Sequence, residues 1–220
     1  FEISEGKYKF RKDNRMFSID KEMKCIHPSI VSIKNFSQSV ADELYSIKDC
    51  NCSNFVDLLL FFKENTSIGA SRISDLIKIE YFSEYGNIRK LLKLKKVFIK
   101  AYDNSKRTFK KQISKDKVDN FGVTDQLVSN FSHKTTDKTY MMVDMDGMLK
   151  EIESIDFADI SPVEKAQYQQ HVLNTVSIID KKQKGVAIVQ SVDTKYTPKL
   201  QLYALANGNT IEVRIDKKSF

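Results

Sequence analysis

The sequence predicts an α+β protein, with a mostly helical N-terminal part and an antiparallel β-meander near the C-terminus. Through much of the first half, apolar residues recur with the spacing of one buried helix face. Beyond residue 186 the spacing changes to alternation, which is typical of half-buried strands. The dipeptide Asn207-Gly208 separates the last two alternating stretches and indicates a tight hairpin turn.

Short strands are expected near the N-terminus. Residues 8–11 and 16–19 alternate in polarity around Asp13-Asn14, a pair typical of turns. Residues 25–27 are expected to add a third strand. From residue 28 onward the apolar residues follow a helical period, with Ser37 or Ser39 available as a helix cap.

Three further helices are expected in the first half of the chain. Residues 55–63 are strongly apolar, which indicates a buried helix. A second helix is expected at 71–79. A turn at 84–86 separates it from a third helix at 88–101.

A polar stretch separates these helices from the C-terminal elements. Residues 104–140 are poor in large aliphatic side chains, so we expect a loosely ordered connector with at most a short helix at 123–131. A helix is expected at 147–155. Ser161-Pro162-Val163-Glu164 is a capping box with Pro at the first helical position, opening a helix that ends near Val176. The strands expected for the meander are 186–192, 200–205 and 210–215.

At 220 residues, with 41% hydrophobic and 30% charged residues, the chain has an ordinary globular composition. Apolar runs such as residues 58–62 are too short to cross a bilayer, so no membrane partner is expected. Three cysteines, an odd number, argue against a disulfide framework and favour a reducing cytoplasmic setting. The chain begins at Phe1 rather than Met, which predicts a fragment or a processed product.

Positive charge is concentrated in residues 87–117, which we call the basic segment. The whole chain has a net charge of +7, yet this segment holds twelve basic and two acidic residues, with Phe98, Tyr102 and Phe109 between them. Such a segment attracts an anionic polymer, because each neutralised phosphate releases condensed counterions. A solvated helix face with long lysine stems is the alternative. The side chains expected to contact DNA are Arg89, Lys90, Lys93, Lys96, Lys106, Arg107, Lys110 and Lys111.

Residues 30–45 match the apolar pattern of a helix-hairpin-helix. Ile30, Ile33, Phe36 and Ala41 occupy its four apolar or small positions. Such a hairpin holds a DNA phosphate with backbone N–H groups at the start of its second helix, where unbonded donors and the helix dipole attract anions. An ordinary helical hairpin is the alternative.

Asn35 and Ser37 stand where two glycines are usual in such a hairpin. Asn tolerates the left-handed conformation, whereas Ser tolerates it less readily and its side chain narrows the approach of a phosphate. The residues expected to position one phosphate are Lys34, Asn35, Ser37 and Gln38.

Four stretches resemble the region beyond the fingers in bacterial replicative DNA polymerases of the C family, the polymerase III alpha subunits. They are residues 32–36 (SIKNF), 40–45 (VADELY), 54–59 (NFVDLL) and 76–87 (LIKIEYFSEYGN), with Arg89, Lys90, Leu91 and Leu92 after the last. The order of these four stretches and the spacing between them both agree with that family. The resemblance covers about residues 8–100 closely and the remainder loosely.

The resemblance implies a helical module that holds the duplex leaving a polymerase active site and borders the sliding clamp. It also implies that an oligonucleotide-binding (OB) barrel for single strands follows. The parent chain would be a DNA-directed DNA polymerase, a nucleotidyltransferase whose catalytic carboxylates lie outside this stretch. Lys195, Tyr196 and Lys199 fall in the first loop, where such barrels pair cationic and stacking groups. Three strands make only a partial OB-like barrel, and a plain β-meander is the alternative.

A clamp-binding peptide is the last feature that the resemblance implies. Such peptides combine a glutamine with a terminal hydrophobic or aromatic residue after the hairpin region. Gln126, Leu127 and Phe131 occupy about the right place. A connector helix is the alternative meaning of this stretch.

Catalytic and metal sites are not expected in this stretch. Asp144 and Asp146 precede a helical pattern, where Asp is expected as a cap, and the later ligands of a calcium loop are missing. Four potential zinc ligands form pairs separated by a single residue, closer than structural zinc sites use. They are Cys25, His27, Cys50 and Cys52. We therefore expect no cofactor.

Three regions are expected: a helix-hairpin-helix DNA-binding module with an N-terminal β-hairpin (1–103), a polar basic connector (104–140), and helices followed by OB-like strands (141–220). The expected function is non-catalytic binding of duplex or single-stranded DNA in replication, with the sliding clamp and other replisome subunits as further partners. We expect the hairpin and the basic segment to face the same phosphates. The alternatives are a protein-interaction module of a replisome and a stand-alone viral or mobile-element replication accessory.

Overall fold

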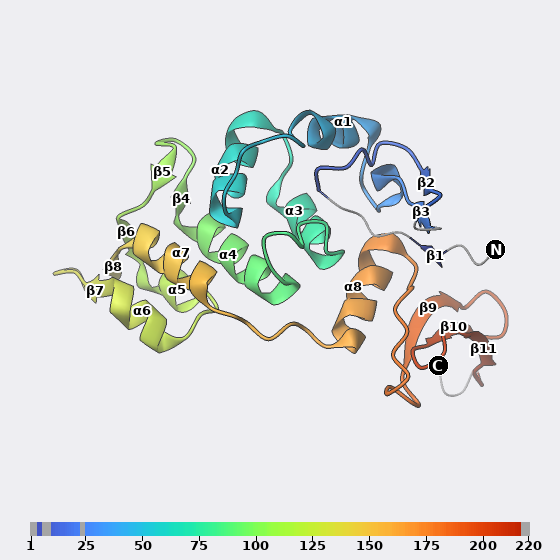
Figure 1. The fold of residues 1–220 in the computed structure, drawn as a ribbon. Helices are drawn as coiled ribbons and strands as arrows, with labels where there is room; N and C mark the ends of the chain where they lie inside the picture. The colour runs from blue at the N-terminus through green and yellow to red at the C-terminus, as the bar shows by residue number, and fades with distance from the viewer. Residues whose placement is uncertain (1–3, 6–9, 23–24, 217–220) are drawn as a thin grey trace. The chain divides into compact units, whose positions relative to one another are not determined.

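The computed structural model describes residues 4–5, 10–22 and 25–216, and it confirms the α+β fold class (Figure 1). The chain forms two compact units. Unit 1 comprises residues 1–45, 78–81 and 160–220, and unit 2 comprises residues 46–77 and 82–159. These boundaries differ from the three expected regions, because unit 1 combines segments from the first and the last part of the sequence.

A small sheet begins unit 1. Its strands are β1 (Ser4–Glu5), β2 (Ser18–Asp20) and β3 (Cys25–His27), in the order β1-β3-β2. Strand β1 is parallel to β3, and β2 is antiparallel to it. β3 lies where a strand was expected, and β2 starts two residues later than expected. In the strand expected at 8–11, residues 8 and 9 lie outside the described part, and Phe10 and Arg11 form a turn.

The Asp13-Asn14 stretch is a packed loop rather than a turn between two strands. Asn14 is buried, and its carbonyl accepts a hydrogen bond from the Ile30 N–H at 2.8 Å. Its side-chain amide donates to the Lys12 carbonyl at 3.0 Å. The Ile30 bond fastens the loop to the segment ahead of the next helix, and β2 pairs with β3.

The predicted capping box opens α8 (Pro162–Leu173). The Ser161 hydroxyl oxygen accepts the Glu164 N–H at 3.2 Å, and the Glu164 carboxylate accepts the Ser161 N–H at 2.9 Å. The helix ends earlier than expected, because Asn174 adopts the left-handed conformation at φ 56°.

The C-terminal sheet is the predicted antiparallel meander. Its strands are β9 (Ala187–Asp193), β10 (Lys199–Ala204) and β11 (Thr210–Arg214), in the order β11-β10-β9. Gly208 lies in the last connection at φ 75°, as a hairpin turn requires. The described strands form an open sheet and do not close into a barrel. Its core residues are Ala166, Val176, Ile188, Tyr203 and Leu205.

Unit 2 contains the three helices that the apolar period predicted. They are α2 (Phe55–Asn65), α3 (Ala70–Lys78, whose last residue belongs to unit 1) and α4 (Ile88–Ala101). Asn54 and Asn87 cap α2 and α4 with their side-chain oxygens. Phe82 follows α3 and packs its ring against Phe55 and Phe62, with centroid distances of 5.7 and 5.8 Å. These aromatic contacts join α2 to the segment that follows α3.

The stretch expected to be a loose connector is ordered. β4 (Tyr102–Asp103) lies just before it, and β8 (Tyr140–Val143) begins at its last residue. Between them are β5 (Thr108–Phe109), β6 (Gln112–Ser114), α5 (Lys115–Asp119), α6 (Asp125–Phe131) and β7 (Ser132–Lys134). β4 pairs with β5, and the other strands form a sheet in the order β6-β8-β7. Four of its large apolar residues are buried and give the stretch a core: Ile113, Val118, Phe121 and Leu127. Strands of two to four residues are too short to show alternation.

α7 (Met145–Ser154) packs on α4 and begins at Asp144, the predicted cap. The Asp144 carboxylate accepts the Gly147 N–H at 3.0 Å. Near the end of α7, the Glu153 carboxylate accepts the Val56 N–H at 3.2 Å. Partial burial raises the pKa of Glu153, although this hydrogen bond opposes the shift. In the described part of the chain, no helix combines the length and the apolar character needed to cross a bilayer.

Candidate nucleic-acid interface

The helix-hairpin-helix pattern folds in unit 1 as a 3-10 turn, η1 (Ile30–Ser32), followed by α1 (Gln38–Ser46). Ser29 caps η1 by accepting the Val31 N–H at 3.2 Å. The first arm is shorter than the expected helix, because Ile33 returns to extended geometry after three residues. The four apolar positions are all buried, as expected: Ile30, Ile33, Phe36 and Ala41.

Asn35 adopts the left-handed conformation, with φ 65°, at the first position where glycine is usual. Asn enters this region more easily than most residues do. Ser37, at the second position, is not among the positive-φ residues of the described chain. The Lys34 N–H donates to the Val172 carbonyl at 3.1 Å, which fastens the turn to the end of α8. The turn between η1 and α1 is therefore fastened at Lys34.

The start of α1 contains backbone donors that the helix itself does not satisfy. Its first helical bond joins the Ala41 N–H to the Ser37 carbonyl at 3.1 Å. The N–H groups of residues 38–40 consequently have no acceptor within the helix. The first turn contains no acidic residue, but Asp42 follows and accepts a hydrogen bond from Gln38 Nε2 at 3.1 Å. The four residues predicted around a phosphate are exposed together here: Lys34, Asn35, Ser37 and Gln38.

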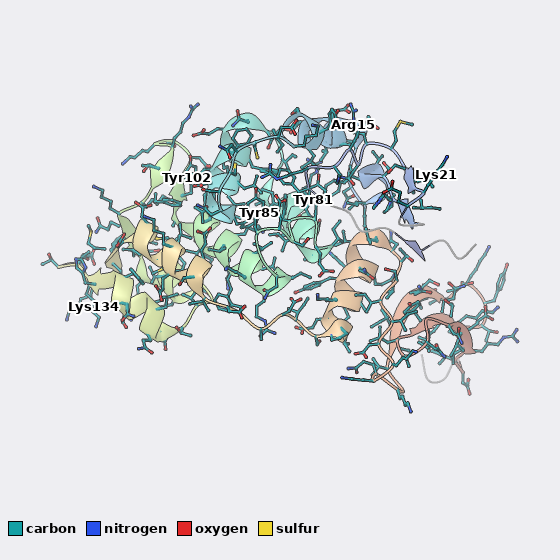
Figure 2. All side chains as sticks on the ribbon, in the orientation of Figure 1. Arg15, Lys21, Tyr81, Tyr85, Tyr102 and Lys134 are labelled. Carbon is teal, nitrogen blue, oxygen red and sulfur yellow. The ribbon has the colours of Figure 1, made fainter. Side chains whose placement is uncertain are left out.

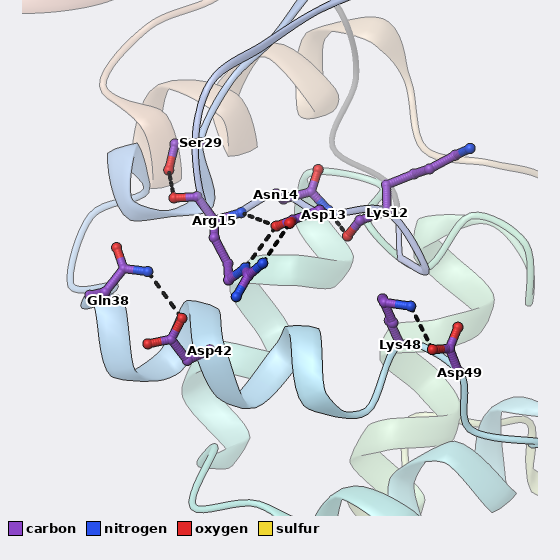
Figure 3. Close-up of polar contacts among 9 residues, drawn as sticks. All are labelled: Lys12, Asp13, Asn14, Arg15, Ser29, Gln38, Asp42, Lys48 and Asp49. Atoms are coloured by element: carbon purple, nitrogen blue, oxygen red, sulfur yellow. Dashed lines mark hydrogen bonds and ion pairs between the residues drawn. The ribbon is translucent and has the colours of Figure 1, made fainter.

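Arg15 supports the hairpin and was not predicted from the sequence. Its guanidinium donates to both carboxylate oxygens of Asp13, at 2.9 and 2.7 Å (Figure 3). These bonds raise the pKa of Arg15. The guanidinium also lies 3.6 Å from the ring centroid of Tyr45, on α1. The Ser29 hydroxyl donates to the Arg15 carbonyl at 2.9 Å. Since Asp13 neutralises its charge, Arg15 orients the hairpin rather than adding to a positive surface.

Part of the basic segment points into unit 2. Lys90 Nζ donates to the Glu153 carbonyl, and Lys95 Nζ donates to the Ser74 hydroxyl. Lys93 Nζ donates to the Gly122 carbonyl and lies 5.4 Å from the ring centroid of Phe157. Partial burial, followed by the nearby charges of Arg89 and Lys96, lowers the pKa of Lys93. These lysines join α4 to its neighbours, so Lys90 and Lys93 are poorly placed for DNA.

The remaining predicted cations of the segment face outward. Arg89 and Lys96 are exposed on α4. Lys106 and Arg107 are exposed at the tip of the β4–β5 hairpin, where Arg107 has a φ of 52°. The Asp103 carboxylate accepts the Ser105 N–H at 3.0 Å and orders this tip. Lys110 is half-buried and Lys111 is exposed after the hairpin.

The aromatic residues of the basic segment form a packed cluster. Phe98 and Tyr102 are buried and stack with a centroid distance of 5.1 Å and an interplanar angle of 12°. Phe109 meets Phe98 edge-on at 5.5 Å. Tyr102, labelled in Figure 2, lies at the base of the β4–β5 hairpin, where it pairs with Phe109. Phe98 and Tyr102 fix the basic tip in place and are not available to stack on DNA bases.

The predicted loop of the C-terminal sheet retains part of its positive charge. Tyr196 is 74% exposed, and Lys195 Nζ lies 5.5 Å from its ring centroid. Lys199 pairs with the Glu212 carboxylate at 3.0 Å, which offsets its charge. The exposed tyrosine and Lys195 together remain available for a nucleic acid.

The residues of the predicted clamp peptide lie in or beside a helix. Thr124 caps α6, Gln126 is exposed, and Leu127 is buried. Phe131 is half-buried against Gly147, where a methyl group would come within 2.8 Å of the Phe131 ring. An extended clamp peptide would require α6 to unfold.

No group of three or more histidine, cysteine or acidic side chains that could hold a metal ion occurs in residues 10–22 and 25–216. Asp144 acts as a helix cap, and Asp146 is exposed in the first turn of α7. Cys50 is buried and Cys52 is half-buried. Comparisons with protein-family models, with curated proteins and with solved structures found no match to this chain.

Proposed function

We propose that this chain binds DNA through phosphate contacts, without catalysis, as a duplex-holding part of a polymerase III alpha-like replication protein in the cytoplasm. The observation that carries the proposal is the turn at Asn35. Its left-handed backbone leads directly into the acid-free first turn of α1, where Gln38 and Ser39 are exposed. That arrangement, together with the sequence resemblance, supports a phosphate at the N–H groups of residues 38–40.

The exposed half of the basic segment supplies a second set of phosphate contacts in this proposal. Lys106 and Arg107 sit on an ordered hairpin tip, and Lys111 follows it. Such contacts position a protein on DNA without reading the bases. We therefore expect similar affinity for duplexes of unrelated sequence.

The first experiment is a titration of a fluorescent duplex at several salt concentrations. If about five phosphates are engaged, the logarithm of the affinity should fall with the logarithm of salt at a slope of roughly −4 to −5. Affinity that is independent of salt would contradict phosphate binding.

A charge placed at the start of α1 tests the hairpin itself. Ser37→Glu sets a carboxylate beside the proposed phosphate, and we expect duplex affinity to fall by about 10-fold. Ser71→Glu is the matched control, because Ser71 is an equally exposed serine at the start of α3. Equal effects of the two substitutions would reject the α1 site.

A protein-interaction module is the second candidate, and one observation favours it. Two cross-strand rows of the C-terminal sheet are entirely apolar: Val192, Leu200 and Val213 in one, and Val189, Leu202 and Ile211 in the other. The outer members of both rows are 38–50% exposed. Pull-down of a purified sliding clamp by the wild-type chain, lost in Val189→Lys, would favour this candidate over DNA binding.

A further inference from the structure

A cavity of about 650 Å³ lies within unit 2, beside the basic hairpin. It opens to solvent and is lined by residues 108–111, by the end of α6 and the start of β7, and by the junction of β8 with α7. Its volume falls within the range of small-molecule sites, which is roughly 300–1,000 Å³. The sequence predicted roles for Lys110, Lys111 and Phe131 but not the cavity that they line, because it forms from three separate stretches of the chain.

The cavity has an apolar lining that includes two aromatic rings. Phe109 and Phe131 come from β5 and α6, and both are half-buried, so part of each ring remains accessible. Met142 is half-buried, and Val143 is buried. Flat apolar surfaces of this kind suit a planar aromatic ligand, and base–aromatic stacking is the usual way in which proteins hold unpaired nucleobases.

Charged and polar groups from different segments line the same cavity. Lys110 and Lys111 contribute positive charge from the strand side. The Lys111 carbonyl accepts the Val143 N–H at 2.9 Å, which fixes the backbone there. Asn130 and Asp146 contribute hydrogen-bond acceptors from α6 and α7. A ligand with an anionic group and an aromatic ring bearing N–H donors satisfies both sets.

We infer that this cavity holds one unpaired nucleobase of a DNA strand, with its phosphate near Lys110 and Lys111. This inference rests on the proposed DNA binding and extends it, because a fully paired duplex offers no base to the cavity. The ring would lie against Phe109 and Phe131, and Asn130 and Asp146 would face its polar edge. Lys106 and Arg107 come a few residues earlier in the protein chain. They would contact neighbouring phosphates of the same DNA strand.

The test compares a single-stranded oligonucleotide carrying one 2-aminopurine with a blunt duplex of the same length, both bound to the full chain. Stacking quenches 2-aminopurine, so we expect quenching with the single strand. Phe131→Leu keeps an apolar contact with Gly147 and should remove most of the quenching, with little change in thermal melting. Unchanged quenching in a folded Phe131→Leu chain would overturn the inference.

A second pair of variants keeps the test independent of Phe131. Lys110→Ala/Lys111→Ala should weaken single-strand binding by roughly 10-fold more than Lys115→Ala/Lys117→Ala, which removes the same charge from exposed positions outside the cavity. Equal losses would overturn the inference while leaving the proposed DNA binding intact. Failure of the wild-type chain to bind either DNA in a salt-dependent way would instead reject the proposed function.

Discussion

The two halves of the basic segment differ in what their lysines contact. On α4, Lys90, Lys93 and Lys95 donate hydrogen bonds to groups within the fold. After α4, Lys106 and Lys111 are exposed. Both halves look alike in the sequence, yet only the second consists mainly of cations free to meet a phosphate. A count of charges in a sequence therefore overstates the charge that a packed helix offers to a ligand.

The same comparison distinguishes aromatic residues that anchor the β4–β5 hairpin from those that could stack on a nucleobase. Phe98 and Tyr102 are buried beneath the hairpin, whereas Phe109 reaches the cavity and Tyr196 is exposed on the C-terminal sheet. Their spacing among lysines does not distinguish these environments. The tertiary packing around each ring decides whether it remains accessible.

The largest expected effect is on stability, at the aromatic anchor. Phe98→Ala removes a fully buried ring and should lower the free energy of unfolding by about 3–5 kcal/mol, measured by urea denaturation. Tyr196→Ala is the control, because its ring is exposed, and it should change stability by less than about 0.5 kcal/mol. A small effect of Phe98→Ala would mean that the hairpin is not anchored as described.

The next effect distinguishes the two halves by affinity. Lys106→Ala/Arg107→Ala removes two exposed cations, so the salt slope for duplex binding should become shallower by about two. Lys90→Ala/Lys93→Ala removes the same charge from partly buried positions and should leave the slope nearly unchanged. Similar slopes for the two double variants would remove the distinction between the halves.

A smaller effect concerns the inward half alone. Lys90→Ala removes a charged donor from the Glu153 carbonyl and should lower the free energy of unfolding by about 1.5 kcal/mol. Lys117→Ala, at an exposed position, should change it by less than about 0.5 kcal/mol. Chemical denaturation compares the two. If Lys117→Ala proved as destabilising as Lys90→Ala, the Lys90 hydrogen bond would contribute no more to stability than an exposed lysine does.

The smallest expected effect is a pH dependence of stability at Glu153. Its carboxylate accepts the Val56 N–H of α2. The folded-state pKa of Glu153 is raised, so the folded chain binds this proton more tightly than the unfolded chain does. Its contribution to stability is therefore present below the unfolded pKa and is lost as the pH rises through the folded pKa. Glu153→Gln should remove that loss. Parallel stability-versus-pH curves for the wild type and Glu153→Gln would contradict the shift.

Helices with long apolar periods could be predicted from the sequence, and so could the caps Asp144 and Ser161. The helix at 88–101 and the capping box at Ser161 form as expected, because burial of a periodic face and local backbone donors decide them. The sheet β6-β8-β7 could not be predicted. Its strands are short, and β8 pairs with β6 across more than twenty intervening residues.

The candidate interface was partly predictable. Asn35 at a usual glycine position indicated the left-handed turn that the structure contains. Arg15 was missed, because its role depends on Asp13 beside it and on Tyr45 thirty residues later. The cavity was also missed, since Phe109, Phe131 and Met142 meet only after the strands pair. Charge patterns located the basic segment but could not show which lysines point inward.

The most direct test is hydrogen exchange of the full chain, measured with and without a duplex of about 20 base pairs. It asks whether the hairpin and the exposed half of the basic segment both bind that DNA. We predict slower exchange in two places when the duplex is bound: at residues 36–40, where the first amides of α1 would meet a phosphate, and at residues 104–111. Exchange that stays unchanged at residues 36–40 while the duplex is fully bound would contradict this binding mode.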